Sequence, residues 1–270
     1  MNEKKEIRRT LGDDTLILTT YHQYHLNEVK KGGAIPSVTS ITGLLDKSTP
    51  LIYWATQLGY DTALDALQAK TDWHIDELLP IMESARVAHA AKKDEAATIG
   101  DIVHNYAEAY ALAQIEGQPI PVVESQDQAV LLGITAFAEL LKTLKPKFIA
   151  AEQLILCRGE AGTPLYAGKL DAIAKVDGKT TLIDYKTGSK VYKEAVLQVA
   201  GYAYANDLEP DSEPIEQAII CRFDKETGKL TTQTYTAKEL KEATEVFMAL
   251  VYTRHALKNI ESLLKTKETE

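Results

Sequence analysis

Two aspartates and a lysine in the second half of the chain have the residue types and spacing of a hydrolytic site. Asp184 and Lys186 are two residues apart at the end of an apolar segment, so in a strand their side chains share one face. Asp171 interrupts another strand-like segment thirteen residues earlier, and the turn Asp177-Gly178 falls between them. Folding this hairpin is expected to bring both carboxylates to the same end of adjacent strands.

Such a pair of carboxylates predicts a divalent metal ion. Two carboxylates a few ångströms apart repel each other unless a cation or a proton lies between them. Mg²⁺ prefers hard oxygen ligands and fills its remaining positions with water and phosphate. The ion would orient and deprotonate a water molecule and neutralise charge on the phosphate under attack. Lys186 would then stabilise the pentacovalent phosphorane or help to activate the water.

The acid-x-lysine triplet does not identify a site by itself. The sequence holds five such triplets, which begin at Glu3, Glu28, Asp177, Asp184 and Glu239. Only the triplet at Asp184 ends an apolar strand, where a charged pair needs a reason. A structural ion pair at a strand end is the simpler interpretation of the triplet alone. Whether the triplet belongs to a catalytic site therefore depends on the residues that accompany it.

Further polar residues accompany these three at useful positions. Gln198 and Tyr202 are four residues apart and share one face of the helix expected after Lys186. His104 lies on an otherwise apolar helix face, four residues before Glu108. A single histidine on a helix is usually structural, but on this face a polar partner is expected.

The motifs GDIVHxxxE, GKLD, IDYKTG and QxxxY occur in this order over residues 100–202. Together they resemble the RecB-type branch of the PD-(D/E)xK nuclease superfamily. That branch includes phage and bacterial recombination exonucleases, the nuclease domains of RecB-like helicase complexes, CRISPR-associated adaptation nucleases and a mitochondrial DNA exonuclease. The segment PSVTSITGLL at 36–45 is also similar to one near the start of several stand-alone members.

The resemblance implies a ligand set for Mg²⁺ or Mn²⁺. It consists of the side chains of His104, Asp171 and Asp184 with the backbone carbonyl of Tyr185. Lys186 becomes the catalytic lysine.

The resemblance also implies supporting roles. Gln198 and Tyr202 become a pair that orients the site and contacts the lysine or the DNA backbone. Glu152 matches a position that adds a carboxylate to the site in some members, and Glu108 is expected to pack nearby. The chain lacks the cysteine set of the iron–sulfur members and also lacks GxxxxGK[ST], so a helicase motor would be a separate protein.

Hydrophobic periodicity predicts a helical first half and a mixed second half. A short hairpin is expected over 15–27, a helix capped by Ser37 over 37–47, and helices almost throughout 50–144 with a break at 117–121. Strands are expected at 148–157, 165–176, 180–187, 215–223 and 229–235. Two more helices are expected at 194–207 and 237–264.

These elements predict an α/β protein in two parts. Residues 1–145 are expected to form a mostly helical N-terminal region with a short hairpin, which contributes His104 and one wall of a DNA cleft. Residues 146–270 are expected to form the nuclease core. With the resemblance, this core becomes a restriction-endonuclease-like mixed β-sheet flanked by helices.

Composition fits one large globular domain or a compact core with a helical extension. The chain has 270 residues, of which 45% are apolar and 26% charged. No apolar run reaches the roughly 18 residues that span a bilayer, and the start does not resemble a secretory signal. Cys157 and Cys221 are expected to be buried free thiols in a reducing cytoplasm, since an iron–sulfur cluster takes about four cysteines.

The net charge of −9 does not decide whether the chain binds nucleic acid. A metal site itself concentrates carboxylates, and net charge says nothing of local patches. Basic clusters occur at Lys4–Lys5 with Arg8–Arg9, at Lys30–Lys31, and at Lys142, Lys145 and Lys147. Solvated surface lysines are the simpler interpretation of each cluster.

Four other residues are candidate DNA contacts. Ser37 and Thr39 could bind a phosphate at a helix start, although plain capping is the simpler interpretation. Tyr53 and Trp54 could stack on an unpaired base, although burial in the helical half is the ordinary one.

The sequence therefore predicts a Mg²⁺- or Mn²⁺-dependent DNA exonuclease of recombination or repair, of phage type, in the cytoplasm of a bacterial or phage-infected cell. An annealing or recombination protein is a candidate partner, and an oligomer is possible. A structure-specific or restriction-like endonuclease and a non-catalytic DNA-binding protein on the same fold are the alternatives.

Overall fold

The computed structural model describes residues 6–29 and 33–268. The basic pairs Lys4–Lys5 and Lys30–Lys31 lie outside the described residues. The chain divides into two compact units. Unit 1 consists of residues 1–44 and 103–270, and unit 2 of residues 45–102.

Unit 1 begins with a small antiparallel sheet. Its strands are β1 (Ile7–Leu11), β2 (Asp14–Leu18) and β3 (Tyr24–Leu26), in the order β1-β2-β3. Leu16 and Leu18 of β2 pack against Leu154 and Leu156 of a longer strand, forming a satellite core. The short helix α1 (Val38–Thr42) follows, and Ser37 caps it by accepting a hydrogen bond from the backbone N–H of Ser40.

The main element of unit 1 is a five-stranded mixed sheet. Its strands are β4 (Lys147–Arg158), β5 (Pro164–Val176), β6 (Lys179–Lys186), β7 (Gln217–Phe223) and β8 (Leu230–Thr236), in sequential order. Only β6 and β7 are parallel, because α5 (Lys193–Asp207) connects them. Asp177 and Gly178 close the β5–β6 hairpin with positive φ angles of 50° and 81°, as a tight primed turn requires.

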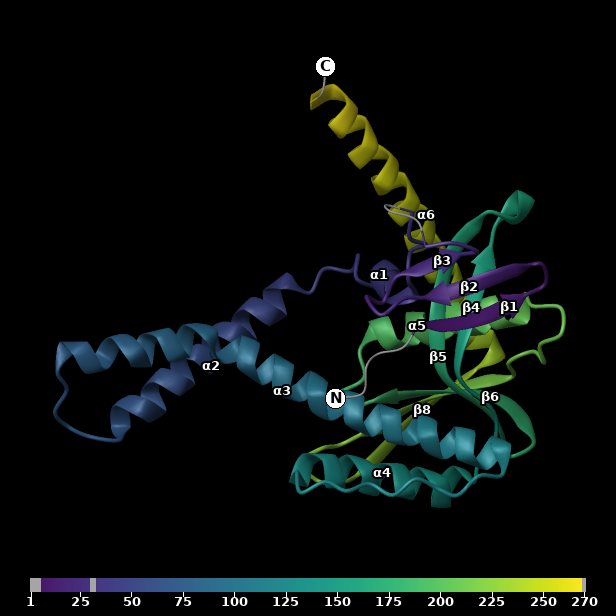
Figure 1. The fold of residues 1–270 in the computed structure, drawn as a ribbon. Coiled ribbons are helices and arrows are strands. Elements are labelled where there is room, and N and C mark those ends of the chain that lie inside the picture. The colour runs from purple at the N-terminus through teal and green to yellow at the C-terminus, as the bar shows by residue number, and fades with distance from the viewer. Residues whose placement is uncertain (1–5, 30–32, 269–270) are drawn as a thin grey trace. The chain divides into compact units, whose positions relative to one another are not determined.

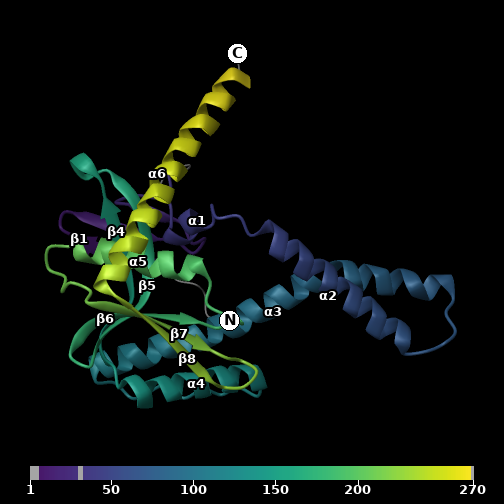
Figure 2. The same ribbon diagram turned by 180° about the vertical axis from the view of Figure 1, so that it is seen from behind.

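Helices bury the apolar faces of this sheet. The end of α3 (Ile75–Glu116) and α4 (Gln128–Leu144) lie side by side in both views of the ribbon (Figures 1 and 2). Val103 and Phe137 from these helices share a core cluster with Ile183 and Tyr185 of β6. A second layer is formed by α5 and α6 (Ala237–Glu268), which pack against each other. The ring of Phe247 in α6 also contacts the ring of Tyr166 in β5.

Unit 2 is a helical hairpin built from α2 (Ser48–Gln68) and the first part of α3. Gly59 of α2 lets the two helices approach, since a Cβ there would lie 3.0 Å from the backbone oxygen of Ala85. No helix in the described ranges combines the length and apolar character needed to cross a membrane.

The expected α/β class with a mixed sheet and flanking helices is confirmed. All five strands of the main sheet and both later helices occur close to their expected positions. Three expectations were wrong in detail: β1 makes the N-terminal hairpin a three-stranded sheet, α1 ends at Thr42, and the helices break again at 69–74. The expected boundary between residues 145 and 146 lies inside unit 1, at the junction of α4 and β4.

The packing of α4 on the sheet yields a matched test of core stability. Leu140 is fully buried in the main core, whereas Leu131 on the same helix is 39% exposed. Leu140→Ala is expected to lower the free energy of unfolding by about 2–5 kcal/mol, because it leaves a cavity. Leu131→Ala should cost under about 1 kcal/mol, and equal losses in urea titrations would contradict this packing.

Candidate active site

Three acidic residues lie in one row across neighbouring strands. The strand register places Asp171 of β5 opposite Glu152 of β4 and one step beyond the last β5–β6 pair, beside Asp184. Beyond this last pair, a side chain bonds to the neighbouring strand: Asp171 Oδ2 accepts a hydrogen bond from the backbone N–H of Tyr185 at 2.7 Å. The hairpin therefore brings the two aspartates together, as their spacing predicted.

Asp184 is a buried carboxylate with incomplete bonding. Its side chain is 1% exposed, and its Oδ1 has no hydrogen-bond partner among the residues described. The Lys186 ammonium lies 2.6 Å from its Oδ2. Burial raises the pKa of Asp184 to about 6, against the lowering effect of Lys186 and with a further rise from Asp171.

Lys186 is a cation held between acids. Burial alone would lower its pKa, but the carboxylates of Asp184 and Asp171 outweigh burial, so the pKa lies above its usual value. The ammonium is therefore protonated at neutral pH and supplies positive charge to the row of acids.

His104 reaches this group from α3. Its Nδ1 lies 3.8 Å from Asp171 Oδ2, and its ring meets the ring of Tyr185 edge-on at 5.9 Å between centroids. The adjacent Val103 is fully buried and fits closely over Gly133 of α4, where a Cβ would lie 2.6 Å from Val103 Cγ2. Helix packing thus fixes the turn of α3 that carries the imidazole.

Gln198 and Tyr202 form the expected pair on α5. Gln198 Nε2 donates to the Tyr202 hydroxyl at 2.9 Å. Burial raises the pKa of Tyr202 well above its usual value, with smaller contributions from Asp171 and Asp184. The Tyr202 ring packs directly on Gly168, where a Cβ would lie 2.6 Å from Tyr202 Cε1. Gly168 in the GKLD motif therefore makes room for this ring.

A second charged group flanks Asp171. Glu152 has a left-handed backbone with φ of 51°, unusual for a non-glycine residue inside a strand, and its carboxylate is ion-paired with Lys169. Glu108 of α3 is half-buried, and burial raises its pKa while Lys169 lowers it and Asp171 raises it. Sequence reasoning missed Lys169, although its position two residues before Asp171 placed both on one strand face.

The candidate DNA contacts fall into both units. Ser37 pairs with Ala167 in a parallel β-bridge, which places the start of α1 beside Gly168, and Ser37 Oγ lies 3.0 Å from Thr39 Oγ1. Tyr53 and Trp54 belong to α2 of unit 2, where both are exposed rather than buried. The DNA-binding roles of all four residues stay predictions.

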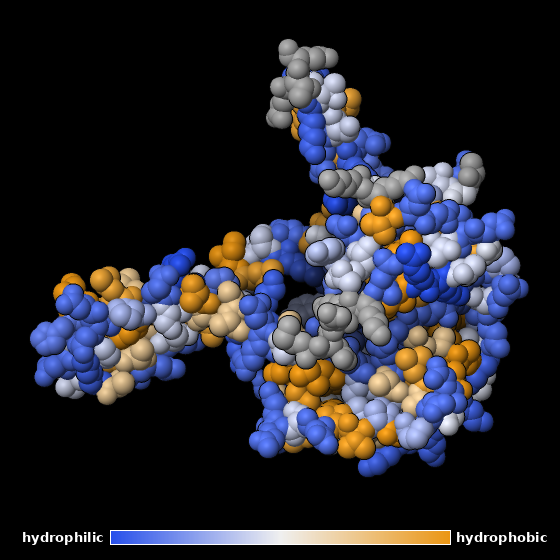
Figure 3. Space-filling view, in the orientation of Figure 1, coloured by the Kyte–Doolittle hydropathy of each residue, from blue (hydrophilic) through white to orange (hydrophobic). Residues whose placement is uncertain are grey.

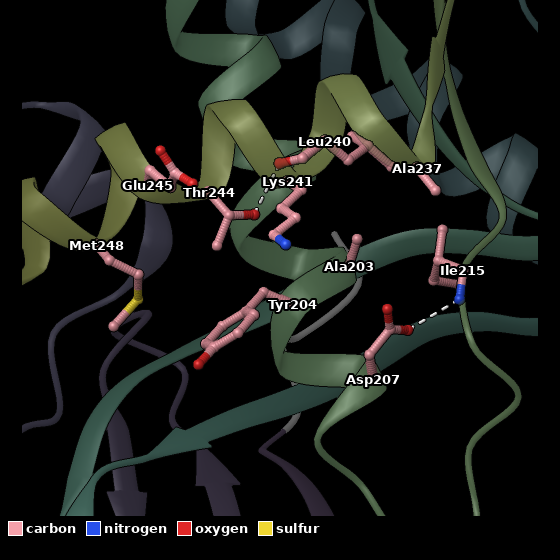
Figure 4. A pocket seen from close by; sticks show the side chains of 10 residues that line it. All are labelled: Ala203, Tyr204, Asp207, Ile215, Ala237, Leu240, Lys241, Thr244, Glu245 and Met248. Carbon is pink, nitrogen blue, oxygen red and sulfur yellow. Dashed lines mark hydrogen bonds between the residues drawn. The ribbon is translucent and has the colours of Figure 1, made fainter.

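A separate cavity of about 540 Å³ lies between α5 and α6 (Figure 4). Its walls include Tyr204, Lys241 and Met248, and Asp207 accepts a hydrogen bond from the backbone N–H of Ile215 at 2.8 Å beside it. No member of the acidic row lines this cavity, so we assign the chemistry to the row.

The donor atoms of the row fit a hard divalent cation. Within the described ranges, no three His, Cys, Asp or Glu side chains are arranged as a ready-made metal site. The chemistry nevertheless matches, because two carboxylates and an imidazole adjoin one another and a buried oxygen of Asp184 has no hydrogen-bond partner in the described part of the chain. The expected ligation by the Tyr185 carbonyl stays a prediction. Cys157 and Cys221 are free and buried, as expected.

The family of the chain follows from a comparison with family models. The model of the PD-(D/E)XK nuclease superfamily matches residues 71–267, which is more than half of the chain. The chain therefore belongs to this superfamily of nucleases, whose members typically use divalent metal ions. The match includes every residue of the acidic row together with His104, Lys186, Gln198 and Tyr202.

Comparisons with individual proteins add nothing to this assignment. Among solved structures, the chain is similar to LHK-Exo in complex with dAMP, with 15% identity, 63% of this chain and 93% of that chain covered, and a TM-score of 0.32. It is also similar to SSO0001, with 14% identity, 55% and 74% coverage, and a TM-score of 0.28. A search of curated proteins gave no match. The assignment therefore rests on the family model.

The contact between Gly168 and Tyr202 yields a second matched test. Gly168→Ala is expected to lower the free energy of unfolding by about 1–3 kcal/mol, because the new methyl group displaces a buried ring. Gly188→Ala is the control, since a Cβ there would lie 3.8 Å from the backbone oxygen of Lys190, an ordinary van der Waals contact. A fully stable Gly168→Ala protein in thermal and urea unfolding would contradict this packing.

Proposed function

We propose that the chain is a metal-dependent deoxyribonuclease of the RecB-type branch, which acts as an exonuclease in DNA recombination or repair. One observation supports this most: in a chain of the nuclease superfamily, buried Asp184 adjoins Lys186, Asp171 and His104, and one of its oxygens accepts no hydrogen bond from any described residue. The order of motifs around this group supports the branch. A separate single-strand annealing or recombination protein would be its partner.

The ligands for Mg²⁺ or Mn²⁺ would be Asp171, Asp184 and His104, joined by the Tyr185 carbonyl. When bound, such an ion lowers the pKa of a water molecule and stabilises charge on the phosphate. Glu152 is ion-paired with Lys169, so its carboxylate would join this set only if Lys169 moved. Asp171 also fixes the backbone of Tyr185, which couples the two neighbouring ligands.

Lys186 would act by electrostatic stabilisation of the phosphorane. A general base must be unprotonated before it can accept a proton from water. The raised pKa of Lys186 keeps its ammonium charged at neutral pH. Of the two roles that the sequence left open, the charge-stabilising role is the one that this protonation state favours.

The remaining residues would orient substrate and site. Gln198 and Tyr202 would hold the α5 face of the site through their hydrogen bond and the fit of the ring on Gly168. Ser37 and Thr39 present hydroxyl groups next to that same stretch of β5, where they would contact a DNA phosphate. Tyr53 and Trp54 are exposed, but they lie on a hairpin of net negative charge, so stacking on a base is the least supported of these roles.

The role of the acidic row can be tested with a control in the same hairpin. Asp184→Asn and Lys186→Met are each expected to lower the rate of DNA cleavage at least roughly a hundredfold, because metal binding or phosphorane stabilisation is lost. Asp177→Asn and Lys179→Met alter the other acid-x-lysine triplet of the hairpin and should leave the rate unchanged. The assay is cleavage of end-labelled linear DNA with Mg²⁺ and with EDTA.

Two substrates separate the alternatives. An exonuclease degrades linear DNA and spares covalently closed circles, whereas an endonuclease cuts both. Cleavage by both site variants at the wild-type rate would reject the site. Metal-dependent DNA binding without cleavage by the wild-type chain would favour the non-catalytic alternative.

The pKa of Asp184 predicts how activity depends on pH. Only the ionised carboxylate binds a metal ion, so protons compete with the metal below the pKa of about 6. At subsaturating Mn²⁺, kcat/KM is expected to fall roughly tenfold per pH unit below that value. Raising the Mn²⁺ concentration should move the midpoint to lower pH. A midpoint that ignores Mn²⁺ would show that another group titrates.

A further inference from the structure

Helix α2 carries an apolar stripe that its own unit leaves partly exposed. None of its side chains is buried. Tyr53, Tyr60, Leu64 and Leu67 nevertheless recur at the spacing of one helix face, and each is between 38% and 73% exposed. Figure 3 shows apolar side chains gathered on the surface of the hairpin. Because an amphipathic helix is stabilised mainly by packing of its apolar face, this stripe indicates a binding surface.

The hairpin around this stripe is acidic. Residues 45–102 contain ten acidic and five basic residues. Ion pairs join three of the basic residues to glutamates within the hairpin: Lys70–Glu77, Arg86–Glu83 and Lys92–Glu95. Asp61 and Asp65 are exposed and follow Tyr60 and Leu64 along α2, so they flank the stripe. This charge opposes DNA binding and favours a basic protein surface.

The end of α6 has the complementary composition. Beyond Val251, no described side chain of α6 is buried. Leu257, Ile260 and Leu264 form an apolar stripe at spacings of three and four residues, and each is between 43% and 58% exposed. Residues 252–268, up to the last residue of α6, contain four basic and two acidic residues. Three of the basic residues, Lys258, Lys265 and Lys267, are exposed.

We propose that the apolar stripe of α2 in one copy of the chain binds the end of α6 in a second copy. Each surface has an exposed apolar stripe, and each carries the charge that the other lacks. Pairing of two α2 hairpins would bring negative charges together, and pairing of two α6 ends would bring positive charges together, so both are unfavourable. The contact joins different surfaces of the two copies, so it builds a closed ring or a chain of copies.

Charge reversal on each surface tests this association in the full-length chain. We expect each of two double variants, Asp61→Lys with Asp65→Lys and Lys258→Glu with Lys265→Glu, to raise the dissociation constant of self-association at least roughly tenfold. The measurement is sedimentation velocity. An equimolar mixture of the two variants should associate again, because each altered surface then meets its altered complement. Lys238→Glu with Lys241→Glu, in the first turns of the same helix, is the control and should associate like the wild type.

Three results would overturn the proposal. One is a wild-type chain that stays monomeric over the whole concentration range. Another is a mixture that does not associate although circular dichroism shows both variants to be folded, since contact between copies requires recovery. The third is a Lys258→Glu, Lys265→Glu variant that associates normally but binds DNA more weakly, which would assign the basic end of α6 to DNA. None of these readouts depends on nuclease activity.

Discussion

The buried negative charge of Asp184 is the constraint on which the rest of the site depends. A carboxylate removed from water needs positive charge or hydrogen bonds, and here Lys186 supplies the charge while one oxygen finds no partner among residues 6–29 and 33–268. Burial raises the pKa of Asp184 most, and the neighbouring Asp171 carboxylate raises it further. Because the folded chain binds this proton more tightly than the unfolded chain, the stability from Asp184 is present below about pH 4 and lost as pH rises through about 6. The fold therefore retains at neutral pH an arrangement that a divalent cation would relieve.

Three glycines allow the helices around the site to pack closely. Gly133 admits Val103 and so sets the helix turn that carries His104. Gly168 makes room for the ring of Tyr202, so the hydrogen-bonded pair of Tyr202 and Gln198 lies against β5. Gly201, on the other side of α5, admits the ring of Phe247 from α6. In each case a methyl group would lie 2.6 Å from a side-chain atom, so the positions of these helices depend on the missing side chain.

The main sheet could be predicted from sequence because its signals are local. Alternation, the Asp177-Gly178 turn and the interruption of strands by Asp171 and Asp184 lie within a few residues of one another. The convergence of His104 on Asp171 came from the family resemblance instead, since no local pattern fixes a contact between residues 67 positions apart. The left-handed Glu152 and its pairing with Lys169 could not be predicted, because both depend on the path of β4 against β5. The break after α2 was missed because the sequence at 69–74 lacks glycine and proline.

The distribution of charge removes the apparent conflict between a net charge of −9 and a DNA substrate. Residues 45–102 carry five of these nine net negative charges, although they make up about a fifth of the chain. Unit 1, which holds the acidic row, is therefore much closer to balance, and its own carboxylates are partly those that a metal ion would neutralise. Average charge describes solubility and association, whereas recognition of a phosphate depends on the groups within a Debye length of it. The acidic surface of the hairpin and the nucleolytic chemistry of the sheet can thus be separate properties of one chain.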